Sequence, residues 1–237
     1  MPETVEKNRI DNLKAPLLVS WQITRDCDLA CLHCCTESAP GKRLSDELDR
    51  EESMKVVGEI VRSEVPYVML CGGEPLVSPH FFELAEALGA AGIQLKIETN
   101  GQRLDDEAAQ RLARLPVRSV QVSLDADTQE VYGRQRPGGS LARAHAACRA
   151  VRAAGLPLEV TFAPTRLNLH EAPAVIRRAD TRRAAWRCPS RGAPARASPP
   201  RARASSLRRP SATRTRSRSR SRVYFSPAKR PESRRNR

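Results

Sequence analysis

The sequence predicts an α/β protein built on a parallel sheet. Short apolar runs of strand length alternate with longer amphipathic segments from about residue 17 to residue 178 of the 237. Strands and helices that alternate at this spacing form parallel βαβ units with right-handed crossovers. Five such units can curl into an open barrel or form a flat doubly wound sheet, and periodicity alone does not choose between the two.

The first unit begins with a strand over Leu17–Thr24. Asp49 followed by Glu52 three residues later predicts a capping box, which opens a helix with one apolar face. The apolar run Tyr67–Cys71 is then typical of a short strand buried in a parallel sheet. These segments predict the β–α–β order of a parallel sheet.

The later units repeat this order. Ser78 predicts a helix N-cap because Pro79 follows it at the first helical position, and Gly92 ends that helix. Further strands are predicted at Gln94–Glu98, Val120–Leu124 and Leu158–Phe162, and further helices at Asp105–Leu115 and Leu141–Ala154. Asn168 and Glu171 predict the cap of one more helix, where the character of the chain changes.

Charge divides the chain into two parts. Residues 180–237 hold 19 of the 41 Lys and Arg residues and two of the 27 acidic ones, so this tail carries about +17 and residues 1–179 about −3. The tail consists mainly of Arg, Ala, Pro and Ser and cannot bury enough apolar surface to offset its ordering entropy. We expect an N-terminal extension over 1–16, a folded core over 17–179 and a disordered tail over 180–237.

Two explanations of the tail remain. Its Arg-Ser repeats at 216–222 suit a basic extension that binds nucleic acid through counterion release. Alternatively, it is a frameshift product, because out-of-frame GC-rich DNA encodes Arg, Ala, Pro and Ser in abundance. The composition and the break inside a helix favour the frameshift. The core is then truncated before a sixth unit, and we expect the strand at 158–162 to be an unpaired edge.

The cysteines indicate a metal centre. Cys27, Cys31 and Cys34 form a C-x3-C-x2-C motif directly after the first strand. A structural zinc site usually takes four ligands in separated pairs, although His33 could complete such a set. Three thiolates instead suit a 4Fe–4S cluster with one open iron.

The first ten residues lack the apolar stretch of a secretory signal, so we expect a reducing, cytoplasmic location.

Four motifs in this order resemble those of radical S-adenosylmethionine (SAM) enzymes. They are the cysteine motif, Gly72-Gly73-Glu74-Pro75, Thr99-Asn100-Gly101 and Ser123-Leu124-Asp125, each at the end of a successive predicted strand. The resemblance implies an incomplete (β/α)6 open barrel with five strands present. It is strongest to peptide maturases and haem-modifying synthases, which carry a C-terminal auxiliary iron–sulfur domain, and we expect that domain to be missing here.

The resemblance also implies cofactors and ligands. Cys27, Cys31 and Cys34 would hold a 4Fe–4S cluster, and reductive cleavage of SAM would give a 5′-deoxyadenosyl radical that abstracts hydrogen. The implied SAM-binding residues are His33, Gly72, Gly73, Glu74, Asn100, Ser123 and Arg136. For three of them a second reading stays open: His33 as a surface histidine, Glu74 as the residue that holds its turn, and Arg136 as an exposed loop arginine.

The expected partners follow from the same resemblance. They are an electron donor similar to flavodoxin or ferredoxin and, as substrate, a peptide or a small cofactor precursor. No membrane partner is expected, and nucleic acid is expected only if the tail is genuine. The competing hypothesis is a non-catalytic iron–sulfur-binding module with a basic tail that binds nucleic acid.

The remaining cysteines are not expected to bind metal. Cys35, Cys71 and Cys148 are interpreted as packed or surface thiols, and Cys188 lies in the tail.

Overall fold

The computed structural model describes residues 15–179 and the strand 222–225. The strands are β1 (Leu18–Gln22), β2 (Tyr67–Cys71), β3 (Gln94–Thr99), β4 (Val117–Ser123), β5 (Leu158–Phe162) and β6 (Arg222–Phe225). The α-helices are α1 (Arg50–Arg62), α2 (Phe81–Ala90), α3 (Asp106–Leu112), α4 (Gln129–Gln135), α5 (Leu141–Ala153) and α6 (Ala172–Ala179). Two 3₁₀ helices, η3 (Pro75–Val77) and η4 (Leu169–Glu171), lie between these elements.

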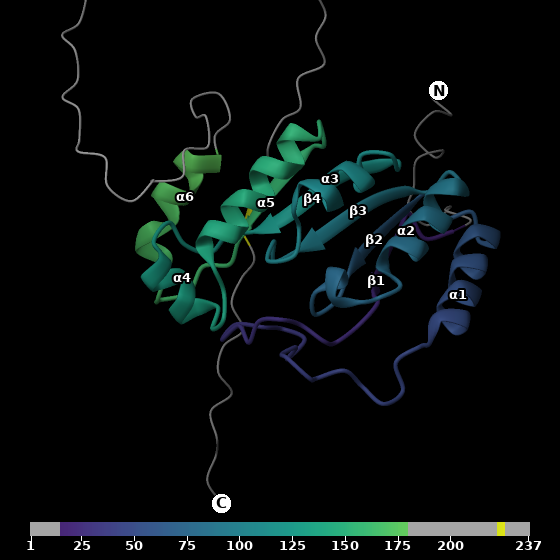
Figure 1. Cartoon of the computed structure of the whole chain (residues 1–237), viewed down its shortest axis with the longest axis horizontal. Coiled ribbons are helices and arrows are strands. Elements are labelled where there is room, and N and C mark those ends of the chain that lie inside the picture. Colours follow the sequence, from purple (N-terminus) through teal and green to yellow (C-terminus); the bar gives the residue numbers. More distant parts are fainter. Residues whose placement is uncertain (1–14, 180–221, 226–237) are drawn as a thin grey trace, which may run out of the picture.

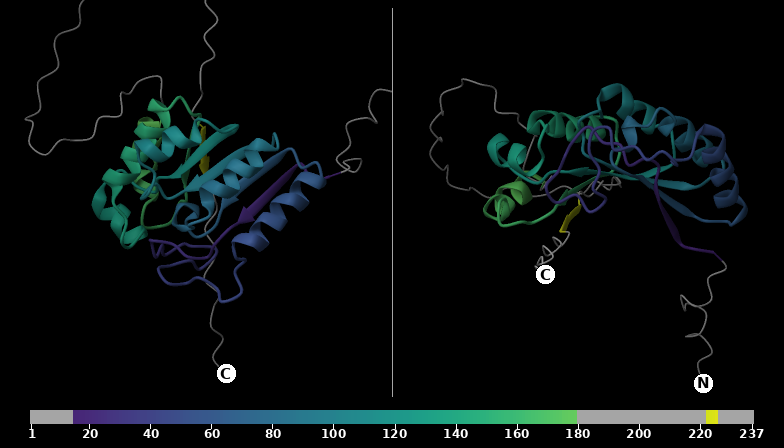
Figure 2. Two further views of the ribbon diagram at one scale, coloured as in Figure 1. Left: turned by 45° about the vertical axis from the view of Figure 1, so that its right-hand side comes forward. Right: turned by 90° about the horizontal axis from the view of Figure 1, so that it is seen from below.

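The order of the strands in space settles the alternative that periodicity left open. All neighbouring strands are parallel, and the sheet order is β1-β2-β3-β4-β5-β6, the same as along the chain. A doubly wound sheet would reverse this order at a switch point. The sheet curves, and α1, α2, α3 and α5 cover one of its faces (Figures 1 and 2). The predicted α/β fold, a partial barrel in which five strands alternate with helices, is therefore confirmed.

The hydrophobic core lies between the sheet and these helices. Alternate residues of each strand point to opposite faces of a sheet. The helix-facing set of the central strands is apolar and buried, and comprises Val68, Leu70, Leu95, Ile97, Val120, Val122, Leu158 and Val160. The intervening residues on the other face include Cys71, Glu98 and Gln121, which are partly polar and line a cavity. The core therefore holds the carboxyl ends of the strands at one edge.

The prediction that β5 ends the sheet is wrong. The backbone of β6 pairs in parallel with β5, with Val160 opposite Val223 and Phe162 opposite Phe225. The sequence Val-Tyr-Phe at 223–225 is a strand-favouring stretch within an arginine-rich tail, and an unpaired strand edge is a template for such a stretch. The predictions for 1–14 and for the rest of 180–237, including disorder and nucleic-acid binding, lie outside the described residues.

Two predicted helix starts have different outcomes. The capping box of α1 is confirmed, because the Glu52 amide donates to Asp49 at 2.9 Å and the Asp49 amide donates to Glu52 at 3.0 Å. The N-cap at Ser78 is wrong. The Glu74 carboxylate instead accepts from the Leu76 amide and opens η3, so α2 begins only at Phe81.

The helix α4 has no counterpart in the sequence prediction. It begins after Thr128, whose side chain caps it. The Glu171 carboxylate, from η4, accepts from the amides of Asp127 and Thr128 at 2.7 and 3.1 Å. Asn168, predicted as a cap, precedes η4 without a capping side-chain bond. The start of α4 thus combines a local signal, the Thr128 cap, with a contact over more than 40 residues of sequence that no local pattern could show.

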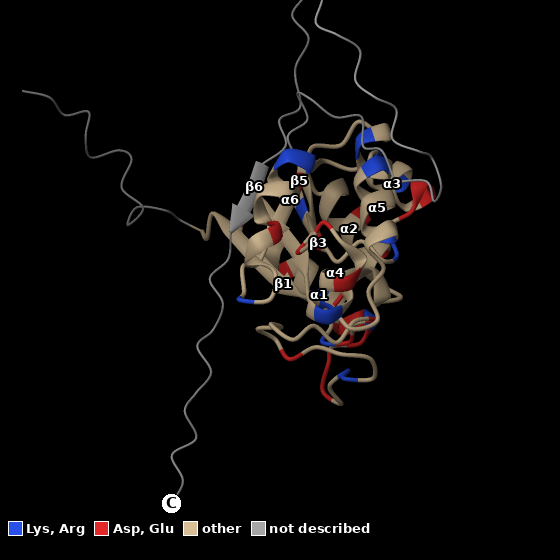
Figure 3. Cartoon of the chain, turned by 90° about the vertical axis from the view of Figure 1, so that its left-hand side faces the viewer, with Lys and Arg blue, Asp and Glu red and all other residues tan. Residues whose placement is uncertain are grey.

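Charged residues of both signs are interspersed on the face of the described chain that Figure 3 shows. This agrees with the near balance of 22 basic and 25 acidic residues before residue 180. In the part of the chain that the structure describes, no helix has both the length and the apolar character that a bilayer span requires.

Candidate functional site

A cavity of about 340 Å³ opens where the strands end. Five thiols line it, from Cys27, Cys31, Cys34, Cys35 and Cys71. The carboxyl edge of parallel strands is where α/β folds place their functional sites. A second cavity, of about 110 Å³, is lined by residues such as Thr24, Glu47 and His80 and by no cysteine. Donor chemistry therefore favours the larger cavity as the candidate site.

The loop after β1 carries four of these thiols, all except that of Cys71, and is anchored by backbone hydrogen bonds. Its amides at Ala30 and Leu32 donate to the carbonyls of Pro137 and Gln135, at 3.3 and 3.1 Å. A turn within the loop joins the Cys34 amide to the Cys31 carbonyl at 3.1 Å. These backbone bonds anchor the loop on the end of α4, and its thiols line the cavity.

The sulfur atoms of Cys27 and Cys34 each lie beside a backbone amide and one polar side chain. The sulfur of Cys27 accepts from the Leu29 amide at 3.4 Å and from Asn100 Nδ2 at 3.7 Å. The Cys34 sulfur lies 3.3 Å from Thr36 Oγ1 and accepts from the Ser38 amide at 3.3 Å. Donors around a sulfur stabilise the thiolate, which is the form that binds metal.

The surroundings shift the pKa values of these thiols in different directions. Burial raises the pKa of Cys27 to about 11, and burial also raises that of Cys31, against the opposing effect of the Arg136 guanidinium. For Cys34 burial is outweighed by the hydrogen bonds from Thr36 and Ser38, which hold its pKa below the usual value. Metal binding to this set would therefore release protons, chiefly from Cys27 and Cys31.

Gly72 and Gly73 lie against the cysteine loop. A Cβ on Gly72 would come within 2.5 Å of the Thr24 carbonyl oxygen, and one on Gly73 within 2.1 Å of that of Asp26. The amides of Gly73 and Glu74 donate to these same two oxygens at 2.7 and 2.9 Å. The glycines are thus required for contact between two loops, a reason that the sequence analysis missed. Both also line the cavity.

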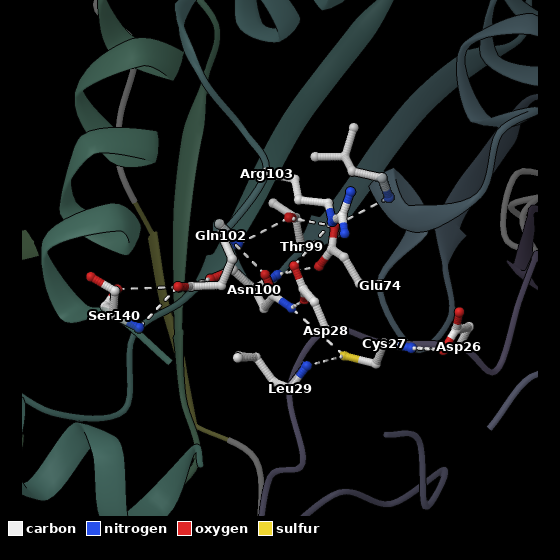
Figure 4. Close-up of polar contacts among 12 residues, drawn as sticks. Asp26, Cys27, Asp28, Leu29, Glu74, Thr99, Asn100, Gln102, Arg103 and Ser140 are labelled. Atoms are coloured by element: carbon white, nitrogen blue, oxygen red, sulfur yellow. Dashed lines mark hydrogen bonds and ion pairs between the residues drawn. The ribbon is translucent and has the colours of Figure 1, made fainter. Parts of the chain in front are cut away.

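Glu74 is fully buried and joins two strand ends (Figure 4). Its carboxylate accepts from the Thr99 hydroxyl at 2.8 Å and from the Asn100 amide at 2.7 Å. Asn100 Nδ2 in turn donates to Asp28 at 2.7 Å, beside Cys27. Glu74 therefore holds its turn and positions Asn100, which is one of the two roles the sequence left open for it.

Burial of Glu74 predicts a measurable pH dependence of stability. Burial raises the pKa of its carboxyl from 4.5 to about 7. The folded chain then keeps a proton that the unfolded chain loses, so the free energy of unfolding falls as the pH rises from about 4.5 to 7. The contribution is on the order of 3 kcal/mol, at about 1.4 kcal/mol for each pKa unit. Glu74→Gln, which stays neutral, removes this fall.

The measurement is urea unfolding across this pH range for both chains, because only their difference is diagnostic. Burial also lowers the pKa of His145 to about 4, and that group adds stability as the pH rises over the same window. The difference between the wild-type and Glu74→Gln profiles cancels this effect. Parallel profiles would show that Glu74 remains ionised and would contradict the prediction.

A second buried network surrounds Asp125, at the end of β4. Asp125 is fully buried, and its Oδ2 lies 2.6 Å from Arg136 Nη2 and 3.0 Å from His33 Nε2. Burial opposes ionisation, but Arg136 and His33 hold the pKa of Asp125 below its usual value. Arg136 Nη1 also donates to the Cys31 sulfur at 3.6 Å. His33 and Arg136 are therefore internal residues of the site, and the readings as surface side chains are wrong.

The structure brings nearly all predicted site residues to one cavity. Those that line it are Cys27, Cys31, His33, Cys34, Gly72, Gly73, Asn100, Ser123 and Arg136, with Glu74 behind Asn100. The sequence analysis missed Glu98, Gln121 and Thr161, which also line the cavity. The alternation of side chains along a strand could have identified two of them. Gln121 lies two residues before Ser123 on β4 and therefore on the same face, and Thr161 of β5 pairs with Ser123.

Two atoms of this cavity wall have unused hydrogen-bonding capacity. His33 Nδ1 and Thr161 Oγ1 are buried and have no hydrogen-bond partner within the described residues. Buried polar atoms usually have a partner, and a polar ligand in the cavity would give these two one. Over the described ranges, no three His, Cys, Asp or Glu side chains are grouped as ligands of a single metal ion. In a 4Fe–4S cluster, by contrast, each thiolate binds a different iron.

The fold and the site together define a protein with a parallel, partial-barrel sheet and a thiol-lined cavity at the ends of its strands. The family model described as the radical SAM superfamily matches residues 21–178. The chain belongs to the radical SAM superfamily. Membership implies a 4Fe–4S cluster and SAM as cofactors, and the thiols, the crowded glycine turn and the unpartnered polar atoms of the cavity fit such groups.

Named relatives are longer than this chain. It is 39% identical over 158 residues to the mycofactocin maturase MftC of Mycobacterium ulcerans (strain Agy99), covering 66% of this chain and 42% of the relative. It is 32% identical over 161 residues to the AdoMet-dependent heme synthase of Methanosarcina barkeri (strain Fusaro / DSM 804), covering 66% and 45%. The chain therefore spans less than half of the length of these relatives.

Solved structures show the same fold. The crystal structure of Streptococcus suis SuiB bound to S-adenosylmethionine matches with a TM-score of 0.61 at 17% identity, over 70% of this chain and 38% of that one. Native anSMEcpe with bound AdoMet matches with a TM-score of 0.51 at 22% identity, over 62% and 44%. At these identities the likeness concerns the fold alone.

Proposed function

We propose that the chain binds a 4Fe–4S cluster through Cys27, Cys31 and Cys34 with SAM beside it, as an oxidoreductase of the maturase type. The convergence of three thiols from one loop on a cavity at the strand ends carries this proposal. When bound, the cluster and SAM supply reductive SAM cleavage and hydrogen-atom abstraction from a substrate. The chain itself supplies ligands, orientation and a partly enclosed site.

The side chains around the cavity have distinct tasks in this proposal. Asn100 and the Leu29 amide direct N–H groups at the Cys27 sulfur. Polar groups that would contact SAM are those of His33, Asn100, Ser123 and Arg136, together with the backbone of Gly72 and Gly73. Glu74 acts through Asn100, since its carboxylate fixes the Asn100 amide.

The names of the relatives support a proposal about the substrate class. Names such as mycofactocin maturase and heme synthase favour a peptide or a cofactor precursor as substrate. A one-electron donor similar to flavodoxin or ferredoxin would reduce the cluster. Six cysteines of the described chain are free thiols, which favours a reducing, cytoplasmic location.

Anaerobic reconstitution of the chain with iron and sulfide tests this function. We expect about four irons per chain and, after addition of dithionite and SAM, release of 5′-deoxyadenosine without any substrate. Samples without dithionite or without SAM are the controls. A loaded cluster that yields no 5′-deoxyadenosine would favour the non-catalytic iron–sulfur module. One zinc per chain, with no charge-transfer absorption, would contradict the cluster itself.

A further inference from the structure

Arg136 stands out because it contacts a cluster ligand and a buried carboxylate at once. Its Nε and Nη2 lie 2.7 and 2.6 Å from Asp125 Oδ2, and its Nη1 lies 3.6 Å from the Cys31 sulfur. The arginine is 7% exposed and Asp125 is fully buried. The guanidinium is therefore held at a fixed place beside the Cys31 sulfur.

The anchoring of Asp125 makes this placement rigid. Asp125 Oδ1 accepts from the Ala163 amide at 2.7 Å, and the backbone carbonyl of Asp125 accepts from Asn168 Nδ2 at 2.8 Å. Its Oδ2 also accepts from His33 Nε2 at 3.0 Å. The carboxylate thus cannot turn away from Arg136 without the loss of several buried hydrogen bonds.

Arg136 gives Cys31 a donor that differs in kind from those of the other two ligands. Cys27 accepts from an amide N–H and a carboxamide, and Cys34 lies beside a hydroxyl and an amide, all of which are neutral. Among the described residues, the donor to Cys31 is the one that carries a full positive charge. A cluster held by these three thiolates would therefore have a positive charge beside one of its ligand sulfurs, that of Cys31.

Reduction of the cluster adds one electron and hence one negative charge. A fixed positive charge close to a ligand sulfur stabilises that reduced state, and burial leaves the interaction poorly screened by solvent. Hydrogen bonds to the sulfurs and nearby charge are established determinants of cluster potentials. The negative charge of Asp125, which pairs with this guanidinium, opposes the effect.

We propose that Arg136 raises the reduction potential of the cluster through Cys31 and that Asp125 limits the rise. In this role both are positioning residues, since they act through Cys31 and neither would be a ligand of the cluster. The electron comes from a low-potential one-electron donor of the ferredoxin or flavodoxin class, and no proton is transferred. The proposal rests on the proposed function only in that Cys31 must bind a cluster.

A redox titration of the reconstituted chain, followed by EPR at one alkaline pH, tests the proposal. Arg136→Gln is expected to lower the equilibrium constant for reduction about tenfold, which is 59 mV for one electron. Asp125→Asn is expected to shift it in the opposite direction, and Arg136→Lys to retain most of the wild-type value. Arg111→Gln, at a half-exposed arginine that pairs with Glu86 and does not line the cavity, is the control and should leave the potential unchanged.

Opposite shifts separate an electrostatic role from a structural one, since damage to the fold would cost both variants iron alike. If Arg136→Gln does not fold, the double variant Arg136→Gln/Asp125→Asn removes the buried pair together, and its potential should lie below that of Asp125→Asn. Equal potentials in wild type and Arg136→Gln, or shifts of the same sign in both single variants, would overturn the proposal. A wild-type chain without iron would instead contradict the proposed function.

Discussion

Alanine in place of any one of Cys27, Cys31 or Cys34 is expected to reduce the iron content of the reconstituted chain from about four per chain to nearly zero. Each thiolate would hold a different iron, so two thiolates remain for a cluster that already has one iron without a protein ligand. This is the largest effect we expect from any single substitution, because it removes the cofactor and all activity that depends on it.

Loss of iron in these variants should not reflect loss of fold. The cysteine loop is fixed by the amides of Ala30 and Leu32 on the carbonyls of Pro137 and Gln135, and an alanine at position 31 leaves those bonds in place. Circular dichroism and the unfolding midpoint of the apo Cys31→Ala chain should therefore change little. Iron analysis and the charge-transfer absorption of the same samples report the cluster.

Cys35 is the matched control within the same loop. Its thiol is exposed and lines the same cavity as the three motif thiols. Cys35→Ala is expected to retain about four irons per chain. Loss of iron in this variant, or full iron in Cys31→Ala, would show that the ligand set differs from the motif.

Local patterns were enough to predict the architecture of the core. The apolar runs at 67–71 and 158–162 are β2 and β5 to the residue, and the Asp49 capping box opens α1 as expected. Parallel strands place their carboxyl ends at one edge, so motifs that follow successive strands had to meet there. This is why the predicted site residues share one cavity in the structure.

Long-range contacts account for what the sequence could not show. Helix α2 begins at Phe81, later than predicted, and the 3₁₀ turn η3 precedes it. Glu74, which accepts from the Asn100 amide at the next strand end, opens that turn. The strand β6 lies some 60 residues beyond β5 in a tail whose composition suggested no structure. The pairing of Arg136 with Asp125 depends on the path of the loop after α4, which no spacing rule predicts.

Substitution of Gly73 is expected to have the second large effect. An added Cβ would meet backbone atoms that cannot move without moving the cysteine loop. A Cβ at this position would lie 2.1 Å from the Asp26 carbonyl oxygen and 2.8 Å from that of Arg25. The Glu74 amide donates to the same Asp26 oxygen at 2.9 Å. Relief of the clash must therefore separate the two loops and break this bond next to Cys27.

Gly73→Ala is accordingly expected to lower the free energy of unfolding by about 3 kcal/mol, the upper end of ordinary overpacking costs. Against a typical domain stability of about 5–15 kcal/mol this is a substantial fraction. We also expect most of the iron to be lost on reconstitution, since Cys27 follows the displaced residue directly. Urea unfolding of the apo chain and iron analysis of the loaded chain measure the two effects.

Gly58→Ala is the control that separates sterics from the general effect of replacing a glycine. Gly58 lies within α1, and the nearest atom to an added Cβ is the mobile end of Arg62, at 3.4 Å. Alanine favours a helix interior over glycine, so this variant should gain up to about 1 kcal/mol and keep its iron. If Gly73→Ala were as stable as wild type and held about four irons, the loop of Asp26 and Cys27 would be free to shift, and the close approach of the two loops would not be what positions the first cluster ligand.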